Sequence, residues 1–225
     1  MTLQAKLDAF KAEFRAGKPP YNVSASVIET MDRATDELIS SGAAIRALKA
    51  GDVAPDFSLP GPDGAIVSSR DLRAQGPLIV SFYRGVWCPY CNMELQALQA
   101  ALPAFRAAGA NLVAISPQTR ANSRKSVREN GLGFPILSDA ANATAAAFGL
   151  RFRMQDYLID LYRDVLRNDL PGFNGDDSWT LPMPGRFVIG SDGVIRYAEV
   201  NPDYTRRPEP ADMLPAVRAA SLARA

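Results

Sequence analysis

The spacing of apolar residues predicts helices at the start of the chain. Apolar side chains recur every three or four residues from Leu3 to Phe14, and a second stripe of the same period covers about 24–40. A Gly-Lys-Pro-Pro run closes the first stretch, and Gly42 is a stop signal for the second. We therefore expect residues 1–50 to form an N-terminal helical extension that packs on the main domain.

The next part of the chain alternates between strand-like and helix-like patterns. Continuous apolar runs over 78–83 and 111–116 are typical of buried strands. Helical patterns follow them, over 92–108 and 119–130, and Pro103 is expected to kink the first helix or end its first half. Strands alternating with helices indicate an α/β sheet with crossover connections.

The pattern continues to the end of a predicted domain over 51–225. An amphipathic helix over 154–167 stands out, within a helical insertion at about 152–183 that we expect to shield or shape the entrance to a site. The other expected elements are a strand at 134–137, a helix at 140–148, hairpin strands at 186–190 and 194–200 around a Ser-Asp-Gly turn, and a helix at 211–220.

Charge and hydropathy exclude several classes of partner. The 225 residues include 25 basic and 24 acidic ones, so the formal net charge is +1. That balance gives no electrostatic footprint for nucleic acid or a membrane surface. No apolar run is long enough for a transmembrane helix, and the first residues lack the apolar core of a signal peptide. We expect no nucleic-acid or membrane partner and a cytoplasmic location.

The scarcity of chemistry-bearing residues narrows the function further. The chain has no histidine, which excludes Ser-His and Cys-His catalysis and any zinc site that contains histidine. It has only two cysteines, too few for a four-cysteine metal site or a disulfide framework. We expect no metal and no cofactor, and redox chemistry is what remains for the cysteines.

The two cysteines form the motif Cys88-Pro89-Tyr90-Cys91, directly after a predicted buried strand and at the start of a predicted helix. Three-residue spacing brings the sulfurs close enough for an internal disulfide, and the free N–H groups of a helix start favour a thiolate. Pro89 suits the first helical turn, and Arg84 is a candidate cation beside the site. A thiolate attacks disulfides or peroxides, so we expect Cys88 and Cys91 to be catalytic.

Three segments resemble the AhpC/TSA family, in its peroxiredoxin-like, CxxC-containing branch. Residues 82–91 (FYRGVWCPYC) are similar to its active-site segment, 51–57 (GDVAPDF) to its opening, and 186–193 (RFVIGSDG) to its late strand and turn. The similarity covers about 51–220. It implies a thioredoxin-like α/β fold, a central mixed sheet flanked by helices, together with the N-terminal helical extension.

The chain also departs from the pattern of that family. Peroxiredoxins carry Pro-x-x-x-Thr-x-x-Cys, and in this register Arg84 takes the proline position, Cys88 the threonine position and Cys91 the peroxidatic position. The family's catalytic arginine would fall on Pro184, which instead matches the cis-proline that faces the CxxC of thioredoxins, so we expect a cis bond there. Arg84 and Arg186 are candidates for the missing cation, although Arg186 is rather expected to be a surface arginine.

Two enzyme hypotheses follow. The first, which the resemblance favours, is an antioxidant thiol peroxidase, in which Cys91 is peroxidatic and Cys88 resolving by register. The second is a thioredoxin- or glutaredoxin-like disulfide oxidoreductase, in which Cys88 attacks and Cys91 releases the mixed disulfide. Trp87, the Cys-Pro-Tyr-Cys sequence and Pro184 favour this second hypothesis. Trp87, Pro89 and Tyr90 are expected to shape the site in either case.

The partners depend on which hypothesis holds. The substrate is a hydroperoxide or a disulfide, and thioredoxin, glutaredoxin or glutathione is the expected electron donor. The resemblance also implies a homodimer. A third hypothesis, ranked below the others, is a non-catalytic redox sensor whose amphipathic helix at 154–167 binds a partner.

Overall fold

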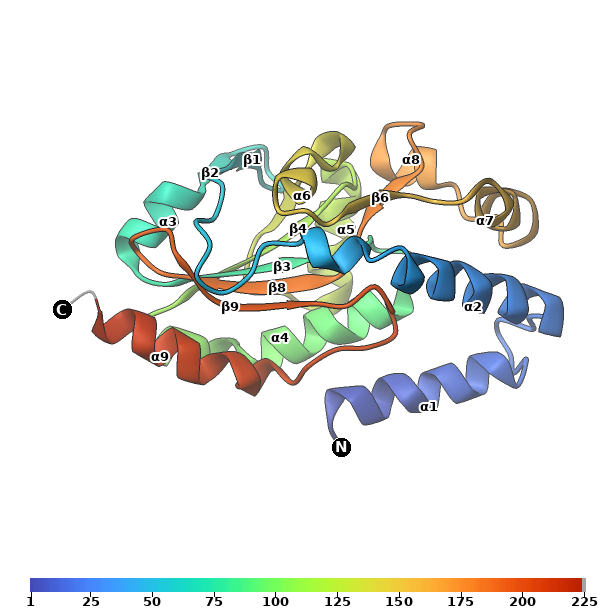
Figure 1. Cartoon of the computed structure of the whole chain (residues 1–225), viewed down its shortest axis with the longest axis horizontal. Coiled ribbons are helices and arrows are strands. Elements are labelled where there is room, and N and C mark those ends of the chain that lie inside the picture. Colours follow the sequence, from blue (N-terminus) through green and yellow to red (C-terminus); the bar gives the residue numbers. More distant parts are fainter. Residues whose placement is uncertain (224–225) are drawn as a thin grey trace.

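The computed structural model describes residues 1–223 and has a five-stranded mixed sheet at its centre (Figure 1). The strand order is β5-β4-β3-β8-β9, with β3, β4 and β5 parallel and β8 and β9 antiparallel to their neighbours. The strands predicted at 78–83 and 111–116 are present, and so is the hairpin predicted near the end of the chain. The strands are β3 (Leu78–Phe82), β4 (Asn111–Ser116), β5 (Ile136–Ser138), β8 (Gly185–Ile189) and β9 (Ile195–Val200).

Helices cover both faces of this sheet. Side chains alternate along β3, so Ile79 and Tyr83 pack towards one set of helices, while Val80 and Phe82 pack towards the other. The first set is α4 (Pro89–Ala107), α5 (Arg120–Asn130) and α9 (Leu214–Leu222); the second is α3 (Ser69–Gln75) and α6 (Ala143–Ala147). The active-site motif follows β3 and therefore lies at the edge of a sheet that is buried on both faces.

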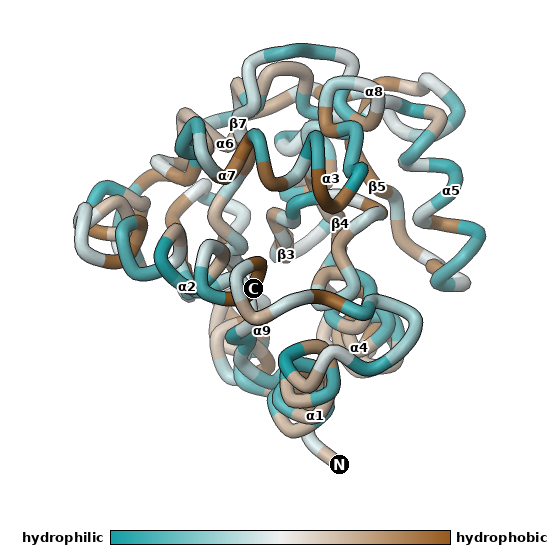
Figure 2. Tube along the Cα trace, turned by 90° about the vertical axis from the view of Figure 1, so that its right-hand side faces the viewer, coloured by the Kyte–Doolittle hydropathy of each residue, from teal (hydrophilic) through white to brown (hydrophobic). Residues whose placement is uncertain are grey.

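Two helices precede the sheet, α1 (Leu3–Arg15) and α2 (Ala25–Ser40), close to the predicted ranges. Helix α1 lies beside α4 in two perpendicular views (Figures 1 and 2), and Leu3 and Leu7 are buried in the same core cluster as the inner face of α4. Helix α2 packs on α7 (Asp156–Asp160) instead. The division into a 1–50 extension and a 51–225 domain stays a prediction.

The helix expected over 154–167 is present but shorter, over 156–165, and its second half is not α-helical. Helix α7 continues into a π-helical segment, η3 (Leu161–Val165), after which the chain turns back into α8 (Leu170–Asn174). The wide turn is closed by a bond from the Leu166 N–H to the Leu161 carbonyl (2.9 Å). Short strands β6 (Arg151–Arg153) and β7 (Thr180–Pro182) pair at the base of this segment.

Helix α4 runs to Ala107 without the expected end at Pro103. The neighbouring side chains Leu102 and Phe105 are buried in the core, and their burial offsets the one hydrogen bond that the proline removes. The remaining elements are η1 (Ala43–Arg46), β1 (Ser58–Pro60), β2 (Ile66–Ser68), η2 (Ala140–Asn142) and η4 (Pro210–Met213). No helix in the described part of the chain is long and apolar enough to cross a membrane.

Candidate active site

Both cysteines lie at the N-terminus of α4, immediately after β3. Cys88 is the N-cap residue, Pro89 occupies the first turn, and the Cys88 N–H donates to the Gly85 carbonyl (3.1 Å). The two Sγ atoms are 2.7 Å apart, and both cysteines are free thiols. Cys88 is 1% exposed and Cys91 0%. The predicted pair is therefore close enough to close a disulfide, but it does not lie on the open surface.

A buried glutamine holds the loop before Cys88. The Val86 N–H donates to Gln118 Oε1 (2.8 Å), and Gln118 Nε2 donates to the hydroxyls of Tyr83 (2.7 Å) and Ser126 (3.0 Å). Asn92 of α4 donates to the Val86 carbonyl from the other side (2.8 Å). These contacts fix the position of the Cys88 backbone, and the sequence offered no signal for them because Gln118 is distant along the chain.

A buried charge cluster lies behind the thiols. Glu94 of α4 accepts from Arg186 Nε (2.7 Å) and, through its other oxygen, from Arg207 Nε. Arg207 Nη2 also contacts Cys91 Sγ at 3.8 Å. Arg84 and Arg207 are both buried, and their positive charges act on Cys88 and favour its thiolate.

The two thiols differ in their ease of ionisation. Burial disfavours the charged form of Cys88, but the hydrogen bond from the Cys91 thiol and the charges of Arg84 and Arg207 outweigh it and lower the pKa of Cys88 to about 6. Burial and the interaction with Cys88 raise the pKa of Cys91 well above its usual range. Cys88 is therefore the thiol of the pair that is expected to ionise first.

Arg84 lies between aromatic side chains next to the thiols. Its Nη2 donates to the Tyr162 hydroxyl (2.6 Å), and its guanidinium lies 4.2 Å from the ring centroid of Tyr204 and 4.8 Å from that of Trp87. Its Nε has no hydrogen-bond partner within the protein. Arg84 is thus a buried cation that is held by its surroundings and keeps one free donor.

The expectation that Arg186 lies on the surface is wrong, since its side chain is fully buried. The register of β8 places Arg186 opposite Ser81, on the face of the sheet that α4 covers, where Glu94 pairs with it. Arg186 reaches Cys91 only through Glu94 and Arg207. The sequence analysis missed Arg207, the arginine that does contact Cys91, because it lies 116 residues further along the chain.

The expected cis bond before Pro184 is also absent, since the one cis bond in residues 1–223 joins Pro19–Pro20. Two residues separate β7 from β8, and hydrogen bonds hold both: the Met183 N–H donates to the Leu150 carbonyl (2.9 Å), and the Pro184 carbonyl accepts from the Asn201 N–H (3.2 Å). Pro184 lines a small cavity shared with Arg84, not the cleft at Cys88.

A cleft of about 470 Å³ leads to Cys88. Cys88 lines it together with Trp87, Pro89 and Tyr90, whereas Cys91 does not. The rest of the lining comes from three parts of the chain: Phe10, Phe14, Pro20, Tyr21, Val23 and Met31 before the sheet; Tyr162, Val165, Leu166, Arg167, Asn168 and Phe173 around η3 and α8; and Arg84 and Tyr204. The predicted insertion thus contributes to the entrance of the site.

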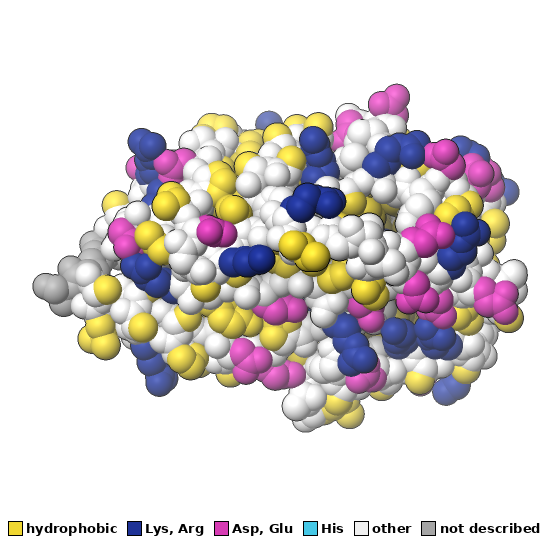
Figure 3. Space-filling model, viewed as in Figure 1, with side chains coloured by type: hydrophobic (Ala, Val, Ile, Leu, Met, Phe, Trp, Pro, Cys, Tyr) yellow, Lys and Arg dark blue, Asp and Glu magenta, His cyan; other side chains and the backbone are white. Residues whose placement is uncertain are grey.

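Basic and acidic side chains are interspersed over the face drawn in Figure 3, with no concentration of one charge on that face. Within residues 1–223 no group of three or more Cys, Asp or Glu side chains is arranged to hold a metal ion. The cysteine pair and its arginines are therefore the chemistry to explain.

Comparison with known proteins gives the family of the chain. The AhpC/TSA family model matches residues 50–198. The chain belongs to the AhpC/TSA family. It is 36% identical over 154 residues to the putative peroxiredoxin MT2597 of Mycobacterium tuberculosis, covering 68% of this chain and 86% of that protein. It is 32% identical over 103 residues to peroxiredoxin Bcp of Escherichia coli, covering 46% of this chain and 65% of that one. These relatives support the predicted enzyme class, a thiol-dependent peroxidase.

Solved structures of AhpC/TSA relatives share the fold. Peroxidoxin BcpB of Mycobacterium tuberculosis superposes with a TM-score of 0.61 at 24% identity, over 76% of this chain and 97% of that one. Peroxiredoxin Q of Xanthomonas campestris gives 0.53 at 21% identity, over 74% and 90%. The predicted thioredoxin-like fold is confirmed.

Proposed function

We propose that this peroxidase reduces hydroperoxides through a Cys88–Cys91 dithiol cycle in which Cys88 attacks first. One observation carries the proposal: of the two thiols, the one that lines the cleft is also the one whose pKa is lowered, to about 6. The family register favours Cys91 as the attacking thiol. The burial and the raised pKa of Cys91 argue for the reverse order in this chain.

The cycle has two steps within the protein. The Cys88 thiolate attacks the terminal OH oxygen of the hydroperoxide and the O–O bond breaks. Cys88 becomes a sulfenic acid that keeps the hydrogen of this oxygen, and the alkoxide or hydroxide that leaves takes up a proton from solvent to give alcohol or water. The Cys91 thiol then attacks Cys88 Sγ, a disulfide forms, and the sulfenic oxygen leaves as water. The Sγ–Sγ distance of 2.7 Å means that the second step needs little movement of the chain.

The buried arginines take the place of the family's missing threonine and arginine. Arg84 has a free Nε donor beside Cys88 and would stabilise the negative charge that develops on the peroxide oxygen. Arg207 would stabilise the Cys91 sulfur when it ionises to attack or leave. Glu94 and Arg186 position Arg207 and touch no reacting atom.

The alternative, a protein disulfide oxidoreductase, has lost one of its supporting features. Pro184 does not line the cleft, and a Cys88 that is 1% exposed cannot meet a disulfide on the surface of another protein. Under the peroxidase proposal, a thiol donor that enters the cleft completes the cycle. A homodimer and a cytoplasmic location stay predictions.

Single-cysteine variants test the order of attack. Cys91→Ser should still form a sulfenate at Cys88 with one equivalent of hydroperoxide, trapped by dimedone and located by mass spectrometry, but should not turn over. Cys88→Ser should form no trapped sulfenate above the level of a free thiol. Sulfenate formation in Cys88→Ser at the wild-type rate would make Cys91 the attacking residue and overturn the proposal.

A further inference from the structure

The cleft above Cys88 is covered by a roof made of two segments, residues 10–31 and 162–173. The first lies before the part that the AhpC/TSA model matches, at 50–198. The rings of Phe10, Phe14 and Tyr21 contact one another, with centroids 5.3–6.2 Å apart, and the Phe10 ring stands edge-on to Tyr90 at 5.0 Å. The N-terminal segment therefore packs directly on the active-site motif.

The roof is anchored to the body of the protein. Leu3 and Leu7 fix α1 in the main core, and an ion pair between Arg15 and Asp32 (2.5 Å) joins α1 to α2. Helix α2 in turn packs on α7, and its buried Val27 and Ala34 share a core cluster with Tyr162 and Leu170 of the second segment.

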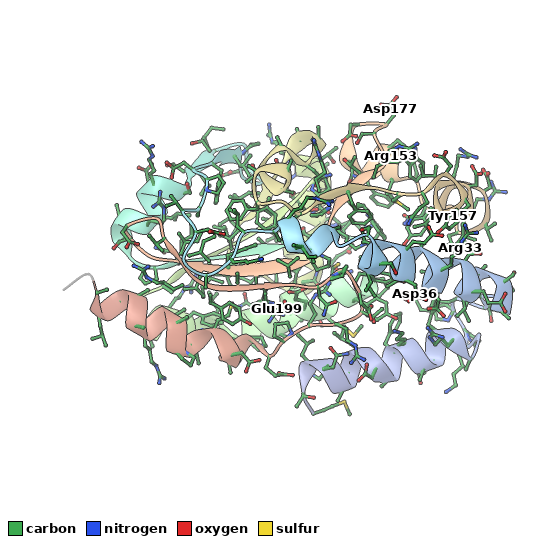
Figure 4. The ribbon with its side chains drawn as sticks, in the orientation of Figure 1. Arg33, Asp36, Arg153, Tyr157, Asp177 and Glu199 are labelled. Carbon is green, nitrogen blue, oxygen red and sulfur yellow. The ribbon has the colours of Figure 1, made fainter. Side chains whose placement is uncertain are left out.

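Tyr157 of α7 and Gln155, the residue before α7, make that second connection. The Tyr157 hydroxyl donates to Glu37 (2.7 Å), as does Gln155 Nε2 (3.3 Å), and Arg33 lies over the Tyr157 ring at 4.3 Å (Figure 4). Because both sides of the roof are fixed in this way, a folded protein partner would have to displace packed helices to touch Cys88.

The charge of the cleft is one-sided. Arg84 lies beside the thiols, and Arg167 lines the cleft from the exposed turn after η3. No acidic side chain is among the residues that line this cleft in the described part of the chain. Aromatic walls lower the local screening by water, so an anion would be held more strongly here than on the open surface. The volume is that of a small-molecule site.

We propose that the donor which reduces the oxidised site is a low-molecular-weight thiol that carries a negative charge, and not a protein thiol. The inference rests on the Cys88–Cys91 disulfide of the proposed function. The donor thiolate attacks Cys88 Sγ, the sulfur that lines the cleft; the Cys88–Cys91 bond breaks, and Cys91 leaves as a thiolate and takes up a proton. A second donor thiolate attacks the donor sulfur of the mixed disulfide, which releases the donor disulfide and the Cys88 thiolate.

A charge series of small thiols tests the proposal on the full chain. The disulfide form is prepared with diamide, so that its formation does not depend on peroxidase activity. Its reduction is then followed by tryptophan fluorescence with 2-mercaptoethanesulfonate, 2-mercaptoethanol and cysteamine, at equal thiolate concentration and low salt. We expect the anionic thiol to react about tenfold faster than the cationic one, as two nearby cations would produce. Equal rates, or the reverse order, would overturn the proposal.

Arg167→Gln should reduce this ratio several-fold, while Arg128→Gln, which removes an exposed arginine of α5 away from the cleft, should leave it unchanged. Reduced thioredoxin at the same thiolate concentration should be slower than 2-mercaptoethanesulfonate. It should gain in rate when Tyr21→Ala opens the exposed rim of the roof. Faster reduction by thioredoxin than by every small thiol would contradict the proposal, whereas failure of the disulfide to form with peroxide would count against the proposed function alone.

Discussion

Cys88 and Cys91 share one turn of chain yet are expected to differ in charge at neutral pH. Burial opposes ionisation of both thiols, and the hydrogen bond from Cys91 together with Arg84 and Arg207 reverses that effect for Cys88 alone. With a pKa of about 6, Cys88 is mostly thiol below pH 6 and mostly thiolate above it. The rate of carbamidomethylation by iodoacetamide should therefore rise with pH and reach half its plateau near pH 6. A midpoint near that of a free cysteine, about 8.5, would contradict this assignment.

Arg207 offers a second test at this scale. Arg207→Gln removes a positive charge near both sulfurs, so the pKa of Cys88 should rise and its alkylation at pH 6.5 should slow several-fold. Arg206→Gln, next to it on the surface, removes the same charge from an exposed side chain that pairs with Asp203 and does not act on Cys88, so it should leave the pH profile unchanged.

Because Arg207→Gln also leaves Glu94 with one partner fewer, the free energy of unfolding should be measured alongside. A variant that is less stable but keeps the midpoint near pH 6 would show that Arg207 is structural only.

Site residues could be predicted from the sequence where they lie close together along the chain. Cys88, Cys91 and Arg84 lie within one strand-to-helix segment, so spacing alone brought them together. Arg207 could not be found in this way, because the fold brings it to Cys91 from beyond β9. The burial of Arg186 depends on the register of β8 against β3, which the sequence pattern does not state.

At the scale of elements, α1 is expected to support the site as well as the fold. Leu7 is fully buried among residues of α4 and the sheet, so Leu7→Ala should lower the free energy of unfolding by about 2–5 kcal/mol. It should also speed alkylation of Cys88 by loosening the roof. Ile45→Ala, at a position 73% exposed, is the control and should change neither quantity. Denaturant unfolding and alkylation rates measure both, and a Leu7→Ala protein of unchanged stability would contradict the packing of α1.

The periodicity of apolar residues predicted the regular helices and strands well, but not the irregular elements. Strands β3 and β4 and helices α2 and α5 match the predicted ranges closely. A buried strand and an amphipathic helix each require a characteristic pattern of apolar residues, which can be recognised in the sequence. The π-helical η3 and the three-residue strands β6 and β7 depend on contacts between residues that are far apart, such as Phe152 with Leu181. The prediction of a helix over 154–167 therefore missed its π-helical turn, and β6 and β7, which lie on either side of that range, were not predicted.

The whole molecule combines the fold of its family with an active site that additional segments cover. The AhpC/TSA fold supplies the sheet edge and the helix N-terminus that carry the cysteines. The N-terminal helices and the 162–173 segment then narrow the access to Cys88. The access route and the expected homodimer can be tested independently, since nothing in the cleft requires a second copy of the chain.

The most direct test of the central claim is stopped-flow mixing of the fully reduced protein with a hydroperoxide, followed by the fluorescence of Trp87 and Trp179. Thiolate population alone should make Cys88 about 30-fold faster than free cysteine at pH 7, and the arginines should add to that factor. We predict a second-order phase faster than this, lost in Cys88→Ser. A rate no better than free cysteine would contradict the peroxidase assignment.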